Sequence, residues 1–387
     1  MKRPLAPISP SERIQSLDVL RGFAVFGILS VNMASFRSPA FIPGYLPPSG
    51  MTLDQAAAFL VKFLAEDKFY TLFSLLFGIG FSVQMSRAEA TGRSLLSFYP
   101  RRLLVLFLFG VLHGLLLWDG DILKLYAMLG CVLLWFRQRR LSRLLATAAV
   151  FFALSAVLLA LPFDRWATTY TGIDLVAQAR AVYTSASYSV VLAHRVRQFP
   201  EALGYTFYQQ GPSVFALFLL GLWVGRQRIF ENIAVHGSWL RRVFWIGLAL
   251  GLPANLAFAV TDNLVLSSVA VTVGAPALSF CYASGLTLLV RSPRWQTWLA
   301  PLANVGRMAL SNYILQSIVC TTVFYGYGCG LYEKVGAFGG LLLTATIFLV
   351  QMRLSGWWLQ RFNFGPLEGL WRATTYGQWQ PLRRSAG

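Results

Sequence analysis

Long hydrophobic blocks alternate along this chain with short polar segments that are rich in arginine. A helix that crosses a bilayer needs about 20 mostly apolar residues, and about ten blocks approach this length. The pattern therefore predicts an all-α, polytopic membrane protein with about ten transmembrane helices in one bundle. The predicted spans are 17–36, 69–85, 103–118, 122–136, 144–161, 205–224, 243–260, 264–290, 309–325 and 338–354.

Two segments do not fit the pattern of a span. Residues 54–66 are amphipathic and predict a short helix at the membrane interface. Residues 162–203 are mostly polar and predict a long outer loop with interfacial helices. We expect residues 1–387 to form a single integral membrane domain. Its parts are the N-terminal helices (17–143), the fifth span with the long outer loop (144–204), and the C-terminal helices with the tail (205–387).

Composition agrees with a membrane protein and gives the chain a direction. Of the 387 residues, 56% are hydrophobic and 12% are charged, whereas soluble proteins carry about 25% charged residues. The net charge of +18 comes mostly from arginines in alternate polar segments, as the positive-inside rule requires. Both termini are therefore predicted to be cytoplasmic, in a multi-pass protein of the bacterial inner membrane, and the charge does not indicate nucleic acid binding.

The first apolar block is expected to be retained as a span, because it carries Arg21 and ends without a small-residue cleavage site. The four cysteines form no CxxC pair, so the sequence predicts no metal or redox centre. There is also no Walker A loop, no HExxH motif, and no GxGxxG motif after a strand. Chemistry in this protein should therefore depend on the few polar residues inside its spans.

An ionisable residue within a span suggests function, because it is costly to bury in a membrane. Arg21 and Asn32 lie eleven residues apart in the first span. That distance is about 16 Å and close to three helical turns, so both face the same side. The alternative for Arg21 is that it extends to the inner interface beside Asp18.

His113 is the only histidine inside a predicted span, and it lies near the outer end of the third one. Imidazole transfers protons well near neutral pH, so His113 is the candidate general base. Asp119 and Asp121 follow in the outer turn, where either carboxylate is placed to orient the ring. The alternative is a neutral histidine that only joins neighbouring helices by hydrogen bonds.

Further polar residues lie near both membrane faces. Arg307 precedes the ninth span, and Ser311, Asn312, Gln316 and Ser317 lie within it. We expect Asn312 and Gln316 to line a cavity, although uncharged polar groups in spans often only join helices. Asp67 and Lys68, just before the second span, are candidate substrate contacts or interfacial anchors.

Several motifs resemble those of the YeiB family of bacterial inner-membrane proteins, whose C-terminal half is a domain of unknown function. The motifs are RIQSLDVLRGFAVFGILSVNMASF, FYTLFSLLFGIGFSVQM, RRLLVLFLFGVLHGLLLWDGDILKLYAMLG, GRMALSNYILQS and GPLEGLWR…TYG. They occur in the same order over nearly the whole chain.

The YeiB family is in turn similar to a superfamily of transmembrane acyltransferases. It includes the heparan-α-glucosaminide N-acetyltransferases and the acyltransferase-3 O-acetyltransferases, and LDVLRG looks like its shared opening. The acyltransferase-3 pattern pairs an arginine with a following histidine. Here Arg21 is in place, and Asn32 stands at the partner position.

The resemblance implies a membrane acyltransferase that uses cytoplasmic acyl-CoA as co-substrate, without a bound cofactor. Arg21 and Arg307 would bind the phosphates, and His113 would act as base, oriented by Asp119 or Asp121. Asn32 or Gln316 would donate to the developing oxyanion. The expected partners are the lipid bilayer and a small-molecule or glycan acceptor, and the oligomeric state is left open. The alternatives are an exporter of a small polar metabolite and a non-catalytic membrane partner.

Overall fold

The computed structural model describes residues 14–42, 45, 52–161 and 174–384. These residues form helices joined by short turns and contain no β-strand; one isolated bridge joins Phe362 and Arg383. The N-terminal helices are α1 (Gln15–Arg37), α2 (Thr52–Leu64), α3 (Lys68–Ala90), α4 (Tyr99–Leu116), α5 (Leu123–Leu133) and α6 (Leu141–Ala160). They are followed by α8 (Leu175–Tyr183), α9 (Tyr188–Arg226), α10 (Ile233–Val260), α11 (Leu264–Leu289), α12 (Pro293–Arg307), α13 (Ala309–Phe324), α14 (Ala337–Arg361) and α15 (Pro366–Tyr376).

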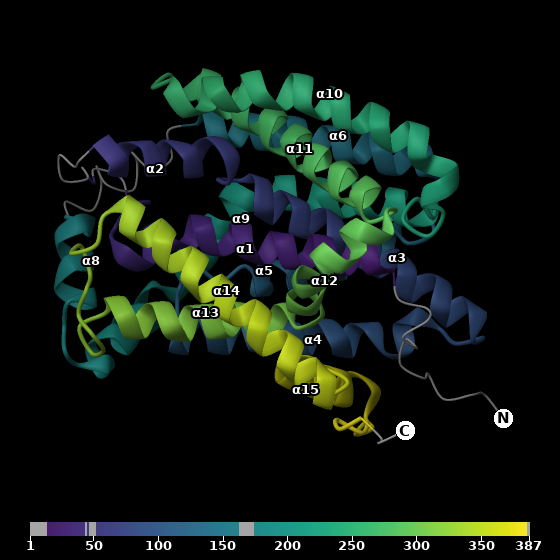
Figure 1. Cartoon of the computed structure of the whole chain (residues 1–387). Helices are drawn as coiled ribbons and strands as arrows, with labels where there is room; N and C mark the ends of the chain where they lie inside the picture. The colour runs from purple at the N-terminus through teal and green to yellow at the C-terminus, as the bar shows by residue number, and fades with distance from the viewer. Residues whose placement is uncertain (1–13, 43–44, 46–51, 162–173, 385–387) are drawn as a thin grey trace.

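Seven helical segments of the described chain are long and apolar enough to cross a membrane. They are α1, α2 with α3 as one segment, α4, α6, α10, α11 and α14. The other three predicted spans correspond to α5 and α13, which are shorter apolar helices, and to the second half of α9. The chain is therefore a polytopic helical membrane protein. Most of its helices run along one direction, and α1 begins at the end of the molecule where α15 lies (Figure 1).

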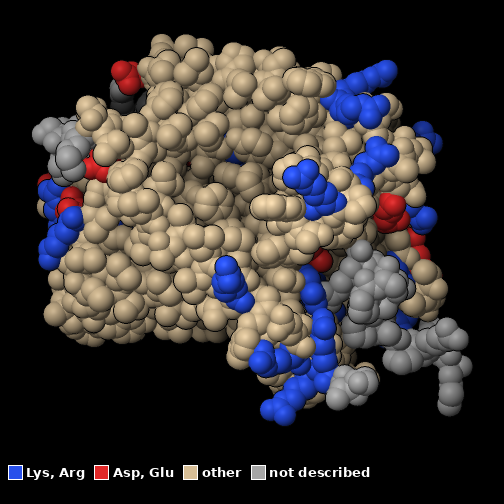
Figure 2. Space-filling model, in the orientation of Figure 1, with Lys and Arg blue, Asp and Glu red and all other residues tan. Residues whose placement is uncertain are grey.

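The surface of the bundle is apolar where a lipid-facing surface is expected. On α4, Leu104, Leu108 and Leu112 form an exposed stripe at four-residue spacing, while His113 is buried behind them. Figure 2 shows a broad band almost free of charge along the helices, hollowed near its middle, with many of the Lys and Arg residues toward the end where α15 lies. We call this end the Arg-rich end.

The sequence predicted a long outer loop with interfacial helices at 162–203, and most of the described residues of this segment are helical. Helix α9 begins at Tyr188 and continues through Pro200 and Pro212 to Arg226, so the sixth span is the second half of a 39-residue helix. The two prolines each remove a backbone donor, but neighbouring helices allow this inside membrane helices. Residues 162–173 lie outside the described residues.

Two helices that were not predicted frame the Arg-rich end. Helix α12 crosses α1 at Gly22 and Gly306, where a Cβ atom on Gly306 would overlap the backbone carbonyl oxygen of Asp18. Helix α15 falls in what the sequence presented as a tail. Both are amphipathic rather than uniformly apolar, and for this reason a search for spans passes over them.

Candidate functional site

A cavity of about 340 Å³ lies at the Arg-rich end between α1, α3, α4, α5, α13 and α15. Five arginines and two carboxylates line it, which leaves an excess of positive charge. These charged residues are Arg21, Arg87, Arg102, Arg307, Arg372, Asp18 and Glu368. The inner part is apolar and aromatic, with Ile28, Phe73, Tyr126 and Tyr313 in its wall.

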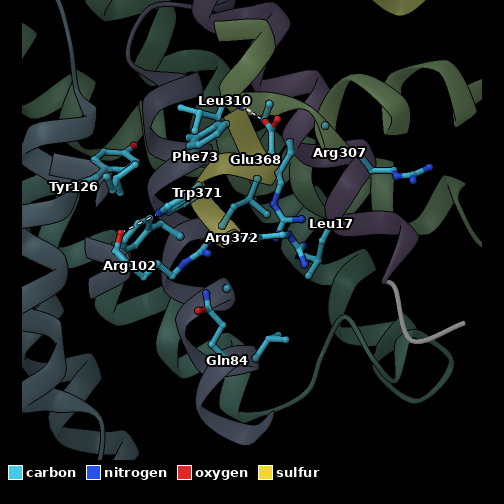
Figure 3. Close-up of a pocket in the computed structure, with 18 of the residues that line it drawn as sticks. Leu17, Phe73, Gln84, Arg102, Tyr126, Arg307, Leu310, Glu368, Trp371 and Arg372 are labelled. Carbon is cyan, nitrogen blue, oxygen red and sulfur yellow. Dashed lines mark hydrogen bonds between the residues drawn. The ribbon is translucent and has the colours of Figure 1, made fainter. Parts of the chain in front are cut away.

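The C-terminal helix α15 builds part of the cavity wall. The guanidinium group of Arg102 lies 3.6 Å from the ring centre of Trp371, whose indole N–H donates to the Arg102 carbonyl oxygen at 2.9 Å. Figure 3 shows Trp371 and Arg102 on one side of the cavity and Arg307 extending away from them on the other. The sequence predicted Arg21 and Arg307 as donor contacts, and the structure places both in the same cavity wall. Arg21 also pairs with Asp18 at 2.8 Å.

Glu368 ties α15 to the start of α13. Its carboxylate accepts hydrogen bonds from the backbone N–H groups of Leu310 and Ser311 and from the Ser311 hydroxyl, at 2.6–3.1 Å. Burial raises the pKa of Glu368 above the ordinary carboxyl value, and the bonds from Ser311 and Leu310 act in the opposite direction. A carboxylate at this position satisfies donors that every helix N-terminus leaves free.

Replacing Glu368 by Ala should lower stability by about 1–2 kcal/mol, because two backbone donors and a hydroxyl lose their acceptor. Thermal unfolding in detergent measures the effect. The control is Glu231→Ala, which removes an exposed carboxylate 3.8 Å from Arg228 and should change stability little. Equal unfolding temperatures for the two variants would show that Glu368 does not hold α13 in place.

His113 lies deeper in the bundle, at the centre of a buried chain of hydrogen bonds. Its Nδ1 lies 2.8 Å from Asp121 Oδ2, and its Nε2 lies 2.8 Å from Ser317 Oγ. The residues His113, Asp121 and Ser317 are each exposed by 2% or less. The ring therefore faces neither lipid nor bulk water, and both of its nitrogen atoms have defined partners.

The charge state of Asp121 determines which nitrogen carries the proton. The second carboxylate oxygen, Oδ1, accepts from the Lys124 backbone N–H at 3.1 Å, and the Lys124 ammonium lies 3.9 Å away. Both carboxylate oxygens of Asp121 therefore have defined contacts, one with the ring of His113 and one with Lys124. Because an ionised carboxylate only accepts, Nδ1 carries the hydrogen and Nε2 accepts from the Ser317 hydroxyl.

Gly110 allows the turn that carries Asp121 to approach α4. A Cβ atom at this position would lie 2.5 Å from the Lys124 backbone nitrogen and 2.7 Å from Asp121 Oδ1. Those separations are too short for any side chain. A glycine at position 110, one helical turn before His113, therefore lets the Asp121 carboxylate reach the imidazole ring. We refer to Asp121, His113 and Ser317 as the buried relay.

The cavity ends close to the buried relay but does not include it. Neither His113 nor Asn32 is among the described residues that line the cavity. Tyr313 belongs to both regions, because it lines the cavity and its ring centre lies 4.9 Å from that of His113. Ser317 follows Tyr313 by one helical turn on α13.

Helices α1 and α4 each have a face that lines the cavity, and each face continues beyond the cavity to a predicted site residue. On α1, Arg21, Val25 and Ile28 line the cavity, and Asn32 is the next position on that face. Asn32 is half-buried, and its side-chain amide makes no hydrogen bond to another described residue. On α4, Arg102 and Leu106 line the cavity, and His113 lies two turns beyond Leu106.

The remaining predicted site residues lie elsewhere. Asn312 donates to Ser355 Oγ, and Gln316 donates to Gln351, so both amides join α13 to α14. Their contacts match the alternative that such groups join helices. Asp119 accepts from the Tyr183 hydroxyl at 3.3 Å and is not the carboxylate on His113.

Asp67 and Lys68 mark the junction between α2 and α3. Asp67 has a positive φ of 64°, and Lys68 is buried, with its ammonium donating to the Lys62 carbonyl oxygen. Neither residue lines the cavity at the Arg-rich end. The structure therefore separates the predicted site into a cavity, a buried relay and two structural junctions.

Sequence reasoning did not select Ser317, Glu368, Arg102 or Trp371 as site residues. Ser317 was recognised only as one of several polar residues in its span. Trp371 and Glu368 belong to the GPLEGLWR motif, and that motif was the available signal, because it places a carboxylate and an indole in a basic terminal segment.

The fold and the cavity define a class: a polytopic helical membrane protein with a cation-lined cavity at one end and a buried carboxylate–imidazole–hydroxyl relay beyond it. Residues 224–378 match the family model described as "Protein of unknown function (DUF418)". The chain is 38% identical to the "Uncharacterized protein YxaH" of Bacillus subtilis (strain 168) over 98% of both chains. It is 30% identical to the "Uncharacterized protein YeiB" of Escherichia coli (strain K12), over 94% of this chain and 96% of that one. The chain belongs to this YeiB-like family, which confirms the resemblance seen in its motifs.

Proposed function

We propose that this protein is an acyltransferase of the bacterial inner membrane, with the Arg-rich end in the cytoplasm. It takes an acyl group, such as acetyl, from acyl-CoA at that end and passes it to a small-molecule or glycan acceptor at the outer side. The observation that carries the proposal is the cavity, which is cationic at the Arg-rich end, apolar inside, and bounded at its far end by the tyrosine that packs on His113.

Three features of the cavity support acyl-CoA as its ligand. Guanidinium groups bind phosphates in a planar, bidentate geometry, and five arginine residues contribute to the wall of the cavity. The apolar interior suits the uncharged arm that carries the thioester. A volume of about 340 Å³ lies within the range of small-molecule sites, which is roughly 300–1,000 Å³.

The buried relay supplies the base that acyl transfer needs. The acceptor hydroxyl or amine loses a proton as it attacks, and a neutral imidazole Nε2 can take it. Asp121 stabilises the imidazolium that forms, and Asn32 is a free amide on the same helix face as Arg21. A donor on one side of the membrane and an acceptor on the other would explain why the enzyme spans the bilayer.

The proposed contact between Arg102 and a phosphate of acyl-CoA is the easiest to test, because the adjacent Arg101 provides a matched control. Arg102 lines the cavity, whereas Arg101 is exposed and does not line it. Arg102→Gln should weaken acyl-CoA binding about 10-fold or more, since one charge-assisted contact to phosphate contributes about 1.5–3 kcal/mol. Arg101→Gln should change the affinity by less than about 3-fold.

Binding of labelled acetyl-CoA to the purified full chain in detergent provides the measurement, followed by assay of acyl release. If the wild type binds no acyl-CoA, the proposed function is wrong. Equal acyl-CoA affinities for the two variants would show that this cavity is not the donor-binding site. Binding of the donor with no acyl release or transfer would instead favour a transport or partner role.

A further inference from the structure

Ser317 forms one end of the buried relay, on the opposite side of the His113 ring from Asp121. The hydroxyl lies 2.8 Å from His113 Nε2, and Asp121 lies 2.8 Å from Nδ1 on the opposite side of the ring. This is the order of atoms through which Asp–His–Ser enzymes activate a serine nucleophile. Three separate segments supply it: α4, the turn before α5, and α13.

We propose that Ser317 Oγ is a nucleophile that carries the acyl group as an ester between donor and acceptor. This inference rests on the proposed function and adds a covalent intermediate to it. The proposal differs from direct transfer, in which His113 would act on the acceptor alone. In the covalent route, the same imidazole serves both half-reactions.

In the first half-reaction, Ser317 Oγ attacks the thioester carbonyl carbon while its proton moves to His113 Nε2. The carbon–sulfur bond breaks, and the sulfur leaves as CoA thiol after taking the proton from the imidazolium. In the second half-reaction, an acceptor hydroxyl or amine attacks the ester carbonyl, and its proton moves to Nε2. The bond from carbon to Oγ then breaks, and the proton returns to Ser317.

The bonding pattern around Ser317 favours this role over a purely structural one. Other buried hydroxyls in these helices, such as Ser284, Thr287 and Thr344, donate to a carbonyl oxygen of the preceding turn in their own helix. Ser317 has no such bond among the described residues, and its single hydrogen bond is to the imidazole. Its hydrogen bond is therefore made to an imidazole nitrogen, which can take up the proton, and not to a carbonyl oxygen, which only accepts a hydrogen bond.

Access to Ser317 from the cavity passes Tyr313. This side chain lines the cavity on α13, packs against the His113 ring, and precedes Ser317 by one turn. Because Ser317 does not line the cavity, the covalent route requires the Tyr313 side chain to move aside. The thioester would then arrive from the Arg-rich end, and Asn32 would lie on the same side of the bundle.

Two reagents test the nucleophile, one that depends on the CoA donor and one that does not. The purified full chain is incubated with labelled acetyl-CoA without acceptor, quenched in acid and digested for peptide mass spectrometry. A second sample receives diisopropyl fluorophosphate, a small apolar agent that modifies activated serines. We expect an acetyl ester and a phosphoryl adduct at Ser317, both absent in Ser317→Ala and in His113→Ala.

Ser284→Ala is the matched control, because it removes a buried hydroxyl that bonds only within its own helix. It should keep both adducts at Ser317. Ser317→Cys should form an acetyl thioester that neutral hydroxylamine removes, which a merely structural hydroxyl would not do. Ser317→Ala should lower the transfer rate by about 10³-fold or more.

The outcomes separate this inference from the proposed function. Acyl release from CoA with no adduct at Ser317, and with the rate kept in Ser317→Ala, would overturn the inference and leave the acyltransferase in place. A phosphoryl adduct that needs His113, without any acyl-CoA binding, would support the nucleophile and reject CoA as the donor. No adduct with either reagent and no acyl release would overturn both.

Discussion

Replacing Asp121 by Asn is expected to lower acyl transfer by about 10⁴-fold, with the helical bundle still folded. An asparagine amide at this position donates to Nδ1, so the imidazole hydrogen moves to Nε2. That nitrogen then donates to Ser317 Oγ and can no longer take a proton from it or from an acceptor. The acyl-CoA cavity is unchanged, so kcat should fall while KM for acyl-CoA stays nearly constant.

The measurement is steady-state transfer of a labelled acetyl group, with thermal unfolding recorded for each variant. Asp174→Asn is the matched control, since Asp174 only caps α8, through the backbone N–H of Ala177. Asparagine is an equally good cap, so this variant should behave as the wild type. A kcat for Asp121→Asn within tenfold of the wild type would show that Asp121 does not set the tautomer of a catalytic histidine.

A second large effect is expected for Gly306→Val, which should destabilise the protein by about 3 kcal/mol or more. The new Cβ atom would overlap the backbone carbonyl oxygen of Asp18, and the two γ-methyl groups would add further overlap. Backbone atoms of two crossing helices cannot be displaced as cheaply as the end of a side chain. Helices α1 and α12 would separate, and with them the Arg21 and Arg307 walls of the cavity.

Thermal unfolding in detergent and acyl-CoA binding should both report this change. Gly204→Ala provides the control, because a Cβ atom there meets nothing within 4 Å. That variant should be as stable as the wild type or slightly more stable, since alanine favours helix by up to about 1 kcal/mol over glycine. If Gly306→Val unfolds at the wild-type temperature, close packing of α1 on α12 is not needed for the fold.

Much of the helical architecture could be read from hydrophobic blocks, because a bilayer requires long apolar helices with internally bonded backbones. The blocks around residues 17–36 and 264–290 coincide with α1 and α11 within a few residues. The boundary of the sixth span was missed because the first half of α9 is polar, whereas the structure continues this segment as one helix into the span. Within it Arg195 is buried, and its guanidinium group donates to the carbonyl oxygen of Leu116 at the end of α4.

The site was predictable only as a set of separate residues. His113 and Asp121 lie eight positions apart, and their pairing follows from a turn that Gly110 lets approach. Ser317 lies 204 positions from His113, and no spacing rule connects them. Asn312 and Gln316, which share the same helix, face α14 instead.

The sequence by itself determined that this chain is an all-helical membrane protein, and its motifs placed it in the YeiB-like family. Both properties are local: hydrophobic length and short residue patterns can be read without knowing which helices touch. Only the tertiary structure decided that Asp121 rather than Asp119 orients His113, that Ser317 completes the buried relay, and that α15 helps to form the cation-lined cavity. Those contacts join segments far apart in the chain, and helix packing, not sequence periodicity, brings them within hydrogen-bond distance.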